Sequence, residues 1–223
     1  HLSRYGAVTR NGKGEAVQGL VIGLKGADAG EIVKGVKQRL EEIKPNLPQG
    51  MTIEVFYDRS ELIGLAVGTV ERALIEATLL VVLLLLLFLG DVRAAVIVAL
   101  SLPMAVLLCF IAMKAIGLSA NLMSLGGLAI AVGILIDGAV VVVENVVERI
   151  NDDKHYKQNK IHNVLTATTE VAKPVFAGLL IIALVFLPLL TLEGLEGKLF
   201  SPVAVTIILA LIASLILSLT LVP

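Results

Sequence analysis

The stretch GILIDGAVVVVENV, residues 133–146, places two acids in an otherwise apolar run. Asp137 lies near the middle of the hydrophobic segment that contains this run, and Glu144 lies near its end. A charged side chain at the centre of a bilayer costs at least ~2.5 kcal/mol on insertion scales, and such residues usually mark ion or proton pathways. The stretch therefore predicts a membrane helix that carries a functional carboxylate.

The composition of the whole chain also favours a membrane protein. Of its 223 residues 57% are hydrophobic, and the mean hydropathy is +0.93. Soluble domains are about 45–50% apolar. The formal net charge of −1 leaves no basic excess for nucleic acid, so we expect no such partner. The single cysteine, Cys109, lies in an apolar run and gives no disulfide or thiolate metal site within the chain, and we expect no cofactor.

Five segments have the length and apolarity of membrane spans. A spanning helix needs about 20 predominantly apolar residues. The segments cover about 62–89, 94–115, 122–147, 164–190 and 199–222. We therefore expect a mainly α membrane protein, with a polytopic five-helix bundle over residues 61–223.

The basic residues between these segments predict the orientation of the bundle. Two connections on one side carry Arg93, Arg149, Lys154, Lys157 and Lys160. The connections on the other side carry only Lys114 and Lys198. Cytoplasmic loops are enriched in Lys and Arg. The first set is therefore expected in the cytoplasm.

Residues 1–60 have a different pattern. Alternating residues predict strands over 15–25 and 51–57, and the spacing of Ile32, Val36 and Leu40 predicts an amphipathic helix between them. About 60 residues bury little core alone. We expect this β-α-β unit to be part of a larger domain, outside the membrane and periplasmic in a bacterium. The absence of an initiator Met indicates a piece of a longer protein.

The two acids are expected on one face of their helix. Seven residues separate them, which is about 20° short of two full turns and about 10 Å along the axis. We interpret Asp137 as a proton relay residue and Glu144 as a second one. For Glu144 the alternative is an anchor at the interface, and for Asp137 it is a structural acid that pairs with a neighbouring helix.

Small residues on the same helix predict close helix packing. Ala129 and Gly133 are four residues apart, as are Gly127 and Ala131, and this spacing lets helices approach closely. Gly138 leaves room beside Asp137. No nucleotide-binding motif or nucleophile–base pair is present in the sequence, so we expect no enzyme and a process driven by an ion gradient.

Residues 126–146, GGLAIAVGILIDGAVVVVENV, resemble the fourth transmembrane helix of the resistance-nodulation-division (RND) efflux pumps. FYDRSELI at 56–63, NLMSLGG at 121–127 and LEGLEGKLFSPVAVT at 192–206 resemble other parts of the same pumps. The resemblance covers nearly the whole chain. It implies a proton-driven homotrimeric antiporter of the bacterial inner membrane, with a periplasmic adaptor and an outer-membrane channel as partners. The chain would then hold the end of the first periplasmic loop and transmembrane helices two to six.

The cargo is less well determined by the resemblance. DGAVVVVEN, residues 137–145, resembles the heavy-metal branch, whereas drug exporters carry a second aspartate where this chain has Gly138. Cobalt-zinc-cadmium pumps carry an aspartate where Ala131 stands, and copper-silver pumps carry methionines where Leu135, Val142 and Leu211 stand. Efflux of a metal cation is the first hypothesis. Export of drugs or organic solutes, and a non-transporting scaffold or sensor, are the alternatives, and the metal-binding residues are unknown.

Overall fold

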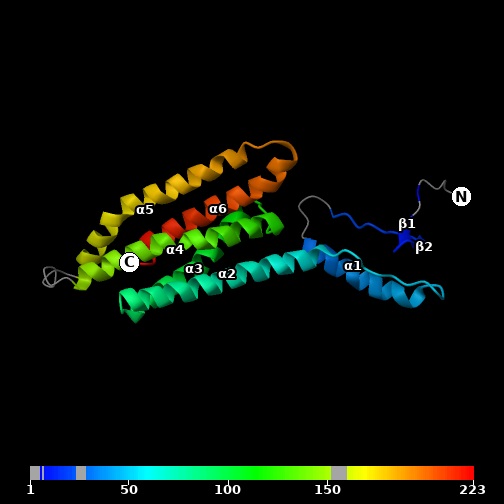
Figure 1. The fold of residues 1–223 in the computed structure, drawn as a ribbon, viewed down its shortest axis with the longest axis horizontal. Helices are drawn as coiled ribbons and strands as arrows, with labels where there is room; N and C mark the ends of the chain where they lie inside the picture. The colour runs from blue at the N-terminus through cyan, green and yellow to red at the C-terminus, as the bar shows by residue number, and fades with distance from the viewer. Residues whose placement is uncertain (1–5, 7, 24–28, 152–159) are drawn as a thin grey trace. The chain divides into compact units, whose positions relative to one another are not determined.

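The computed structural model describes residues 6, 8–23, 29–151 and 160–223. The chain divides into two compact units, His1–Ser60 and Glu61–Pro223. Figure 1 shows the ribbon, with the first unit in blue and the helices of the second from cyan to red. Each unit is described by itself below.

The first unit begins with a β-hairpin. Strands β1 (Val8–Arg10) and β2 (Lys13–Ala16) are antiparallel, and Val8 lies opposite Ala16. The turn residues Asn11 and Gly12 have φ angles of 53° and 70°. An Asn-Gly pair tolerates this left-handed backbone, whose twist matches that of the two strands.

Helix α1 (Ala29–Ile43) confirms the amphipathic helix expected in this unit. Ile32, Val36 and Leu40 are half-buried along one stripe of α1, as their spacing predicts. A short 3-10 helix, η1 (Lys44–Asn46), follows, with Pro45 near its start.

The two predicted strands differ from the structure. Strand β2 ends at Ala16, and residues 17–23 and 51–57 form no strand. Residues 24 and 25 lie outside the described part of the chain. A strand exists only where a neighbouring strand accepts and donates its backbone hydrogen bonds. Among the described residues these two segments have no such neighbour. The described part of the first unit is therefore a β-hairpin followed by a helix, and not a β-α-β unit.

The second unit consists of long helices. These are α2 (Arg59–Phe88), whose first two residues precede the boundary, α3 (Val92–Ala115), α4 (Leu122–Asn151), α5 (Lys160–Leu190) and α6 (Gly194–Thr220). Among the described residues, four helices, α3 to α6, are long and apolar enough to cross a membrane. The chain is therefore a multi-pass, mainly helical membrane protein, as predicted.

Helix α2 differs from the other four in composition. It carries Glu71, Arg72 and Glu76 near its middle, so the uncharged part that follows them covers only residues 77–88. That part is shorter than the roughly 20 residues of a full span. A fifth span at α2 stays a prediction.

Helix α4 lies at the centre of the second unit. It packs against α3, α5 and α6, and α6 also packs against α3 and α5. Leu128, Ala131 and Val142 of α4 are fully buried, as are Val98 of α3 and Ile207 of α6. Helix α2 stands farther from α4, and two grooves lie between these helices.

Candidate functional site

The start of α4 is fixed by its N-cap. The Oδ1 atom of Asn121 accepts hydrogen bonds from the backbone N–H groups of Met123 and Ser124, at 3.0 and 2.9 Å. The hydroxyl of Ser124 in turn accepts a 2.9 Å bond from the N–H of Asn121. Such reciprocal bonds satisfy donors that have no partner within the helix. They set the register from which the positions of both acids follow.

One face of α4 is pressed against α6. A Cβ atom on Gly127 would lie 2.8 Å from the carbonyl oxygen of Val203 and 3.0 Å from its Cα. Only glycine permits this backbone approach. Further along α4, the carbonyl oxygen of Leu135 accepts a 2.8 Å hydrogen bond from the hydroxyl of Ser214 on α6. This face of α4 is therefore closed by the chain itself.

Gly138 lies on the closed side, between α5 and α6. A Cβ atom at this position would lie 3.5 Å from Cγ1 of Val175, 3.7 Å from Oγ of Ser218 and 3.9 Å from Cδ1 of Leu179. These are ordinary packing distances. Gly138, the residue next to Asp137, thus lies where α4 packs against α5 and α6.

Asp137 points to the opposite, open side of α4. It is exposed, and it lines a groove of about 260 Å³ between α2 and α4. The other lining residues are all apolar: Val81, Leu84, Leu85, Ile136, Val140 and Val141. Asp137 is therefore the one titratable side chain among the described residues that line this groove.

Glu144 is exposed on the same open side. The helix geometry places it about 10 Å further along α4 than Asp137. Ala129 is half-buried and lines the second groove, of about 300 Å³, together with Leu62 and Leu65 of α2. Gly133 is exposed, and no neighbouring atom lies within 4 Å of a Cβ built on it. A continuous face with both acids and the small residues Ala129 and Gly133 is thus left open by α3, α5 and α6.

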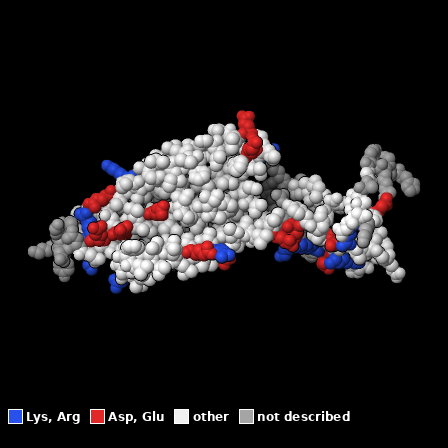
Figure 2. Space-filling model, viewed as in Figure 1, with Lys and Arg blue, Asp and Glu red and all other residues white. Residues whose placement is uncertain are grey.

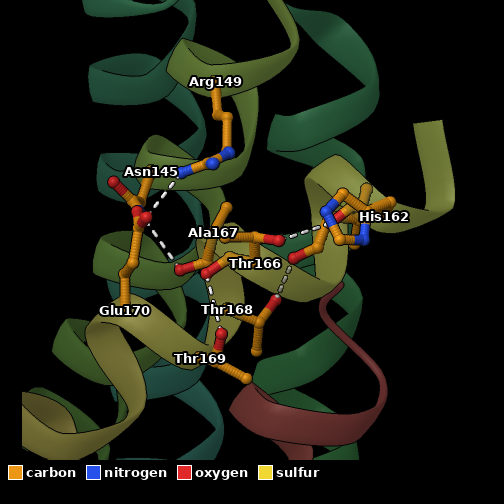
Figure 3. Close-up of polar contacts among 9 residues, drawn as sticks. Asn145, Arg149, His162, Thr166, Ala167, Thr168, Thr169 and Glu170 are labelled. Carbon is orange, nitrogen blue, oxygen red and sulfur yellow. Dashed lines mark hydrogen bonds and ion pairs between the residues drawn. The ribbon is translucent and has the colours of Figure 1, made fainter. Parts of the chain in front are cut away.

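Two polar contacts join α4 to α5 near Asn151, and Figure 3 draws both. The side-chain amide of Asn145 donates a 2.7 Å hydrogen bond to the carbonyl oxygen of Ala167. The guanidinium of Arg149 forms a 2.5 Å ion pair with Glu170. Sequence reasoning missed both contacts. The charges of Arg149 and Glu170 were a signal, but the acceptor for Asn145 is a backbone carbonyl, which no side chain reveals.

A metal-binding cluster is not formed by the part of the chain that the structure describes. Within residues 6, 8–23, 29–151 and 160–223 there is no group of three or more His, Cys, Asp or Glu side chains placed to hold an ion. Figure 2 shows that most of this face of the second unit is uncharged, with acidic and basic side chains near its ends and a mixed group partway along it. Asp137 in its groove is therefore the chemically informative position in this unit.

Comparison with known proteins gives consistent matches over almost the whole chain. The model of the AcrB/AcrD/AcrF family matches residues 2–223. The cobalt-zinc-cadmium resistance protein CzcA of Cupriavidus metallidurans is 43% identical over 99% of this chain and 21% of its own length. The cation efflux system protein CusA of Escherichia coli is 41% identical over 99% of this chain and 22% of its own length. The chain thus spans about a fifth of the curated relatives it matches.

A solved structure shares the fold. The crystal structure of a heavy metal efflux pump aligns with a TM-score of 0.71 and 37% identity, over 90% of this chain and 20% of that one.

Proposed function

The chain belongs to the AcrB/AcrD/AcrF family of RND transporters, and we propose that the complete protein exports heavy-metal cations in exchange for protons, with Asp137 as the proton carrier. The observation that carries this proposal is the position of Asp137. It lies midway along an apolar helix, in an apolar groove, on the face that the packed helices leave open. A carboxylate at that depth in a membrane is energetically costly, and residues of this kind usually have a function.

The groove supplies a physical reason for cycling of the proton. Apolar surroundings in general favour the neutral form of a carboxylic acid, and a cationic side chain brought near favours the carboxylate. A conformational change that brings such a group close and removes it would load and release one proton at each cycle. Glu144, on the same face, is the proposed second relay site. Its alternative role is an anchor at the membrane surface.

The proposed cargo rests on the relatives and on the residues around Asp137. CzcA is named for resistance to cobalt, zinc and cadmium, and CusA for cation efflux. The DGAVVVVEN stretch resembles the same branch. We therefore favour heavy-metal cations over organic solutes.

The proposed setting is the bacterial inner membrane. The Lys and Arg distribution supports a cytoplasmic location for the loop between α4 and α5, although Lys154 and Lys157 lie outside the described residues. The first unit would then be a periplasmic piece of the porter domain. As the family resemblance implies, the complete protein would be a homotrimer that works with a periplasmic adaptor and an outer-membrane channel.

The test is Asp137→Asn in the full-length protein. Asn keeps the size and hydrogen-bonding capacity of Asp but does not titrate. We expect normal insertion and assembly, loss of resistance to toxic metal salts, and loss of metal-driven proton flux in vesicles. Glu144→Gln is the matched control on the same face and is expected to do less harm. Substantial proton flux in Asp137→Asn would make Asp137 a structural acid.

A further inference from the structure

Helix α5 is divided by a proline. Pro174 lies within the helix and has no N–H group, so the carbonyl oxygen of Glu170 lacks its usual intrahelical donor. Such a site is where helices bend. The ribbon of α5 is curved in Figure 1. The proline separates a first segment, residues 160–173, from a second segment, residues 174–190.

The first segment is held to α4 by two contacts, which we call the clamp: Asn145 with Ala167, and Arg149 with Glu170. Ala167 is fully buried, and the side chains of Arg149 and Glu170 are 19% and 52% exposed. A hydrogen bond at 2.7 Å and an ion pair at 2.5 Å fix both the position and the rotation of this segment against α4. Glu170 therefore belongs both to the clamp and to the interrupted turn.

Threonines beside the proline weaken the helix further. The hydroxyl of Thr168 donates a 2.8 Å bond to the carbonyl oxygen of Val164, and that of Thr169 donates a 2.9 Å bond to Thr166. Figure 3 shows these hydroxyls next to the clamp. Bonds of this kind compete with the backbone ladder and bend helices. The bend is thus located at the end of the clamped segment.

The second segment contacts α4 through apolar side chains, on the side of α4 that is turned away from the Asp137 groove. Val175 and Leu179 pack beside Gly138, the residue that follows Asp137. Much of the rest is exposed, including Phe176, Ile181 and Leu184. Dispersion contacts permit small sliding movements that a hydrogen bond or ion pair resists.

We propose that α5 is a hinged helix, in which the segment before Pro174 stays clamped to α4 while the segment after it tilts when Asp137 exchanges its proton. The proposal rests on the proposed function for the role of Asp137. The hinge itself follows from the proline, the clamp and the unequal contacts on its two sides. It makes Asn145, Arg149 and Glu170 positioning residues for proton-coupled movement.

Spin-label distances in the full-length protein test the hinge. The native Cys109 is buried, and Cys109→Ala removes it as a labelling site. One label pair at Ile130 and Leu184 reports on the second segment, and a pair at Ile150 and Leu165 reports on the clamped one; all four residues are exposed. We expect the first distance to shift between wild type at alkaline pH and Asp137→Asn, which mimics the protonated acid. The second distance should stay constant.

Two proline variants decide whether Pro174 is the hinge. Pro174→Ala restores the donor to Glu170 and should abolish the shift of the Ile130–Leu184 distance. Pro188→Ala is the matched control in the same helix and should leave that shift intact. Equal shifts of both label pairs, no shift of either, or an undiminished shift in Pro174→Ala would overturn the hinge.

Charge variants test the clamp, and transport separates the two proposals. Arg149→Gln should broaden the Ile150–Leu165 distribution, and Arg149→Glu combined with Glu170→Arg should narrow it again. An unchanged distribution in Arg149→Gln would contradict the clamp. If metal-driven proton flux survives in Asp137→Asn, the proposed function is refuted but the hinge is not. If the flux needs Asp137 but both label distances stay constant, the hinge is refuted and the proposed function is not.

Discussion

The hydroxyl of Ser214 on α6 donates a hydrogen bond to the carbonyl oxygen of Leu135 on α4, two residues before Asp137. Ser214 is 4% exposed, so this contact forms inside the bundle. Together with the close approach of Gly127 to Val203, it fixes the rotation of α4 about its axis. Asp137 lies in the open groove because these contacts hold the opposite face of α4 against α6.

Loss of the Ser214 hydroxyl should loosen this attachment. Interhelical hydrogen bonds in membrane bundles contribute about 0.6 kcal/mol on average. We expect Ser214→Ala to lower the unfolding free energy of the full-length protein by about that amount. The matched control is Ser218→Ala, since the hydroxyl of Ser218 is directed to Leu215 of its own helix. Denaturant unfolding in detergent micelles checks both, and an equal loss in the two variants would contradict an interhelical role for Ser214.

A larger side chain should affect the stability of the bundle differently at two glycines of α4. Gly127→Ala places a Cβ against the backbone of Val203, and overpacking of this kind costs about 1–3 kcal/mol. No described atom lies within 4 Å of a Cβ built on Gly133, so we expect Gly133→Leu to change the stability of the bundle little. We expect it to impair assembly or transport instead, because the open face is proposed to meet another helix of the complete protein. Unchanged expression, trimer formation and resistance in Gly133→Leu would show that this face meets lipid.

The sequence predicted the membrane helices well because their apolar length is decisive. The expected segment 122–147 corresponds to Leu122–Asn151, and 164–190 corresponds to Lys160–Leu190. The helices are longer than the apolar segments because helical backbone continues into polar residues at one end. Hydropathy measures where a helix meets lipid and does not measure where it stops.

The prediction was less successful where partners decide the structure. The expected strand 51–57 has the right composition but no neighbouring strand among the described residues. The Asn11–Gly12 pair, in contrast, forms a hairpin that its sequence alone indicates, and this signal was overlooked. The spacing of Asp137 and Glu144 predicted a shared face. The groove beside Asp137 depends on the separation of α2 from α4, which no local pattern specifies.

Cysteine labelling should establish the orientation of the membrane helices. Ile161 at the start of α5 and Gln49 in the first unit are both exposed, whereas the native Cys109 is buried. The Lys and Arg asymmetry predicts that Ile161→Cys reacts only with reagents that enter the cytoplasm. Gln49→Cys should react with impermeant reagents from the periplasm. Intact cells and inverted vesicles give the two readouts, and the reverse pattern would invert the proposed topology.

The stability of the start of α2 should depend on pH through Asp58. The Asp58 side chain is 6% exposed, forms a 2.5 Å ion pair with Lys37, and accepts hydrogen bonds from the hydroxyl and N–H of Ser60 at 2.7 and 2.8 Å. The contact with Lys37, followed by those with Ser60, lowers the pKa of Asp58 from 3.8 to about 2. Because the folded pKa lies below the unfolded one, the stabilisation is fully present above about pH 4 and is lost as the pH falls through about 2.

Asp58→Asn isolates this charge, because Asn still caps a helix but does not pair with Lys37. We expect backbone amides of residues 59–63 to exchange hydrogen faster in the variant than in wild type at pH 5. The ratio of the two rates should approach one as the pH is lowered towards 2, because wild-type Asp58 then becomes neutral as well. Glu54→Gln is the control. It breaks the ion pair with Arg10, whose two side chains are 61% and 60% exposed, and such exposed pairs contribute little. A rate ratio that does not change between pH 5 and pH 2, or an equal effect of Glu54→Gln, would show that the charge of Asp58 does not stabilise the start of α2.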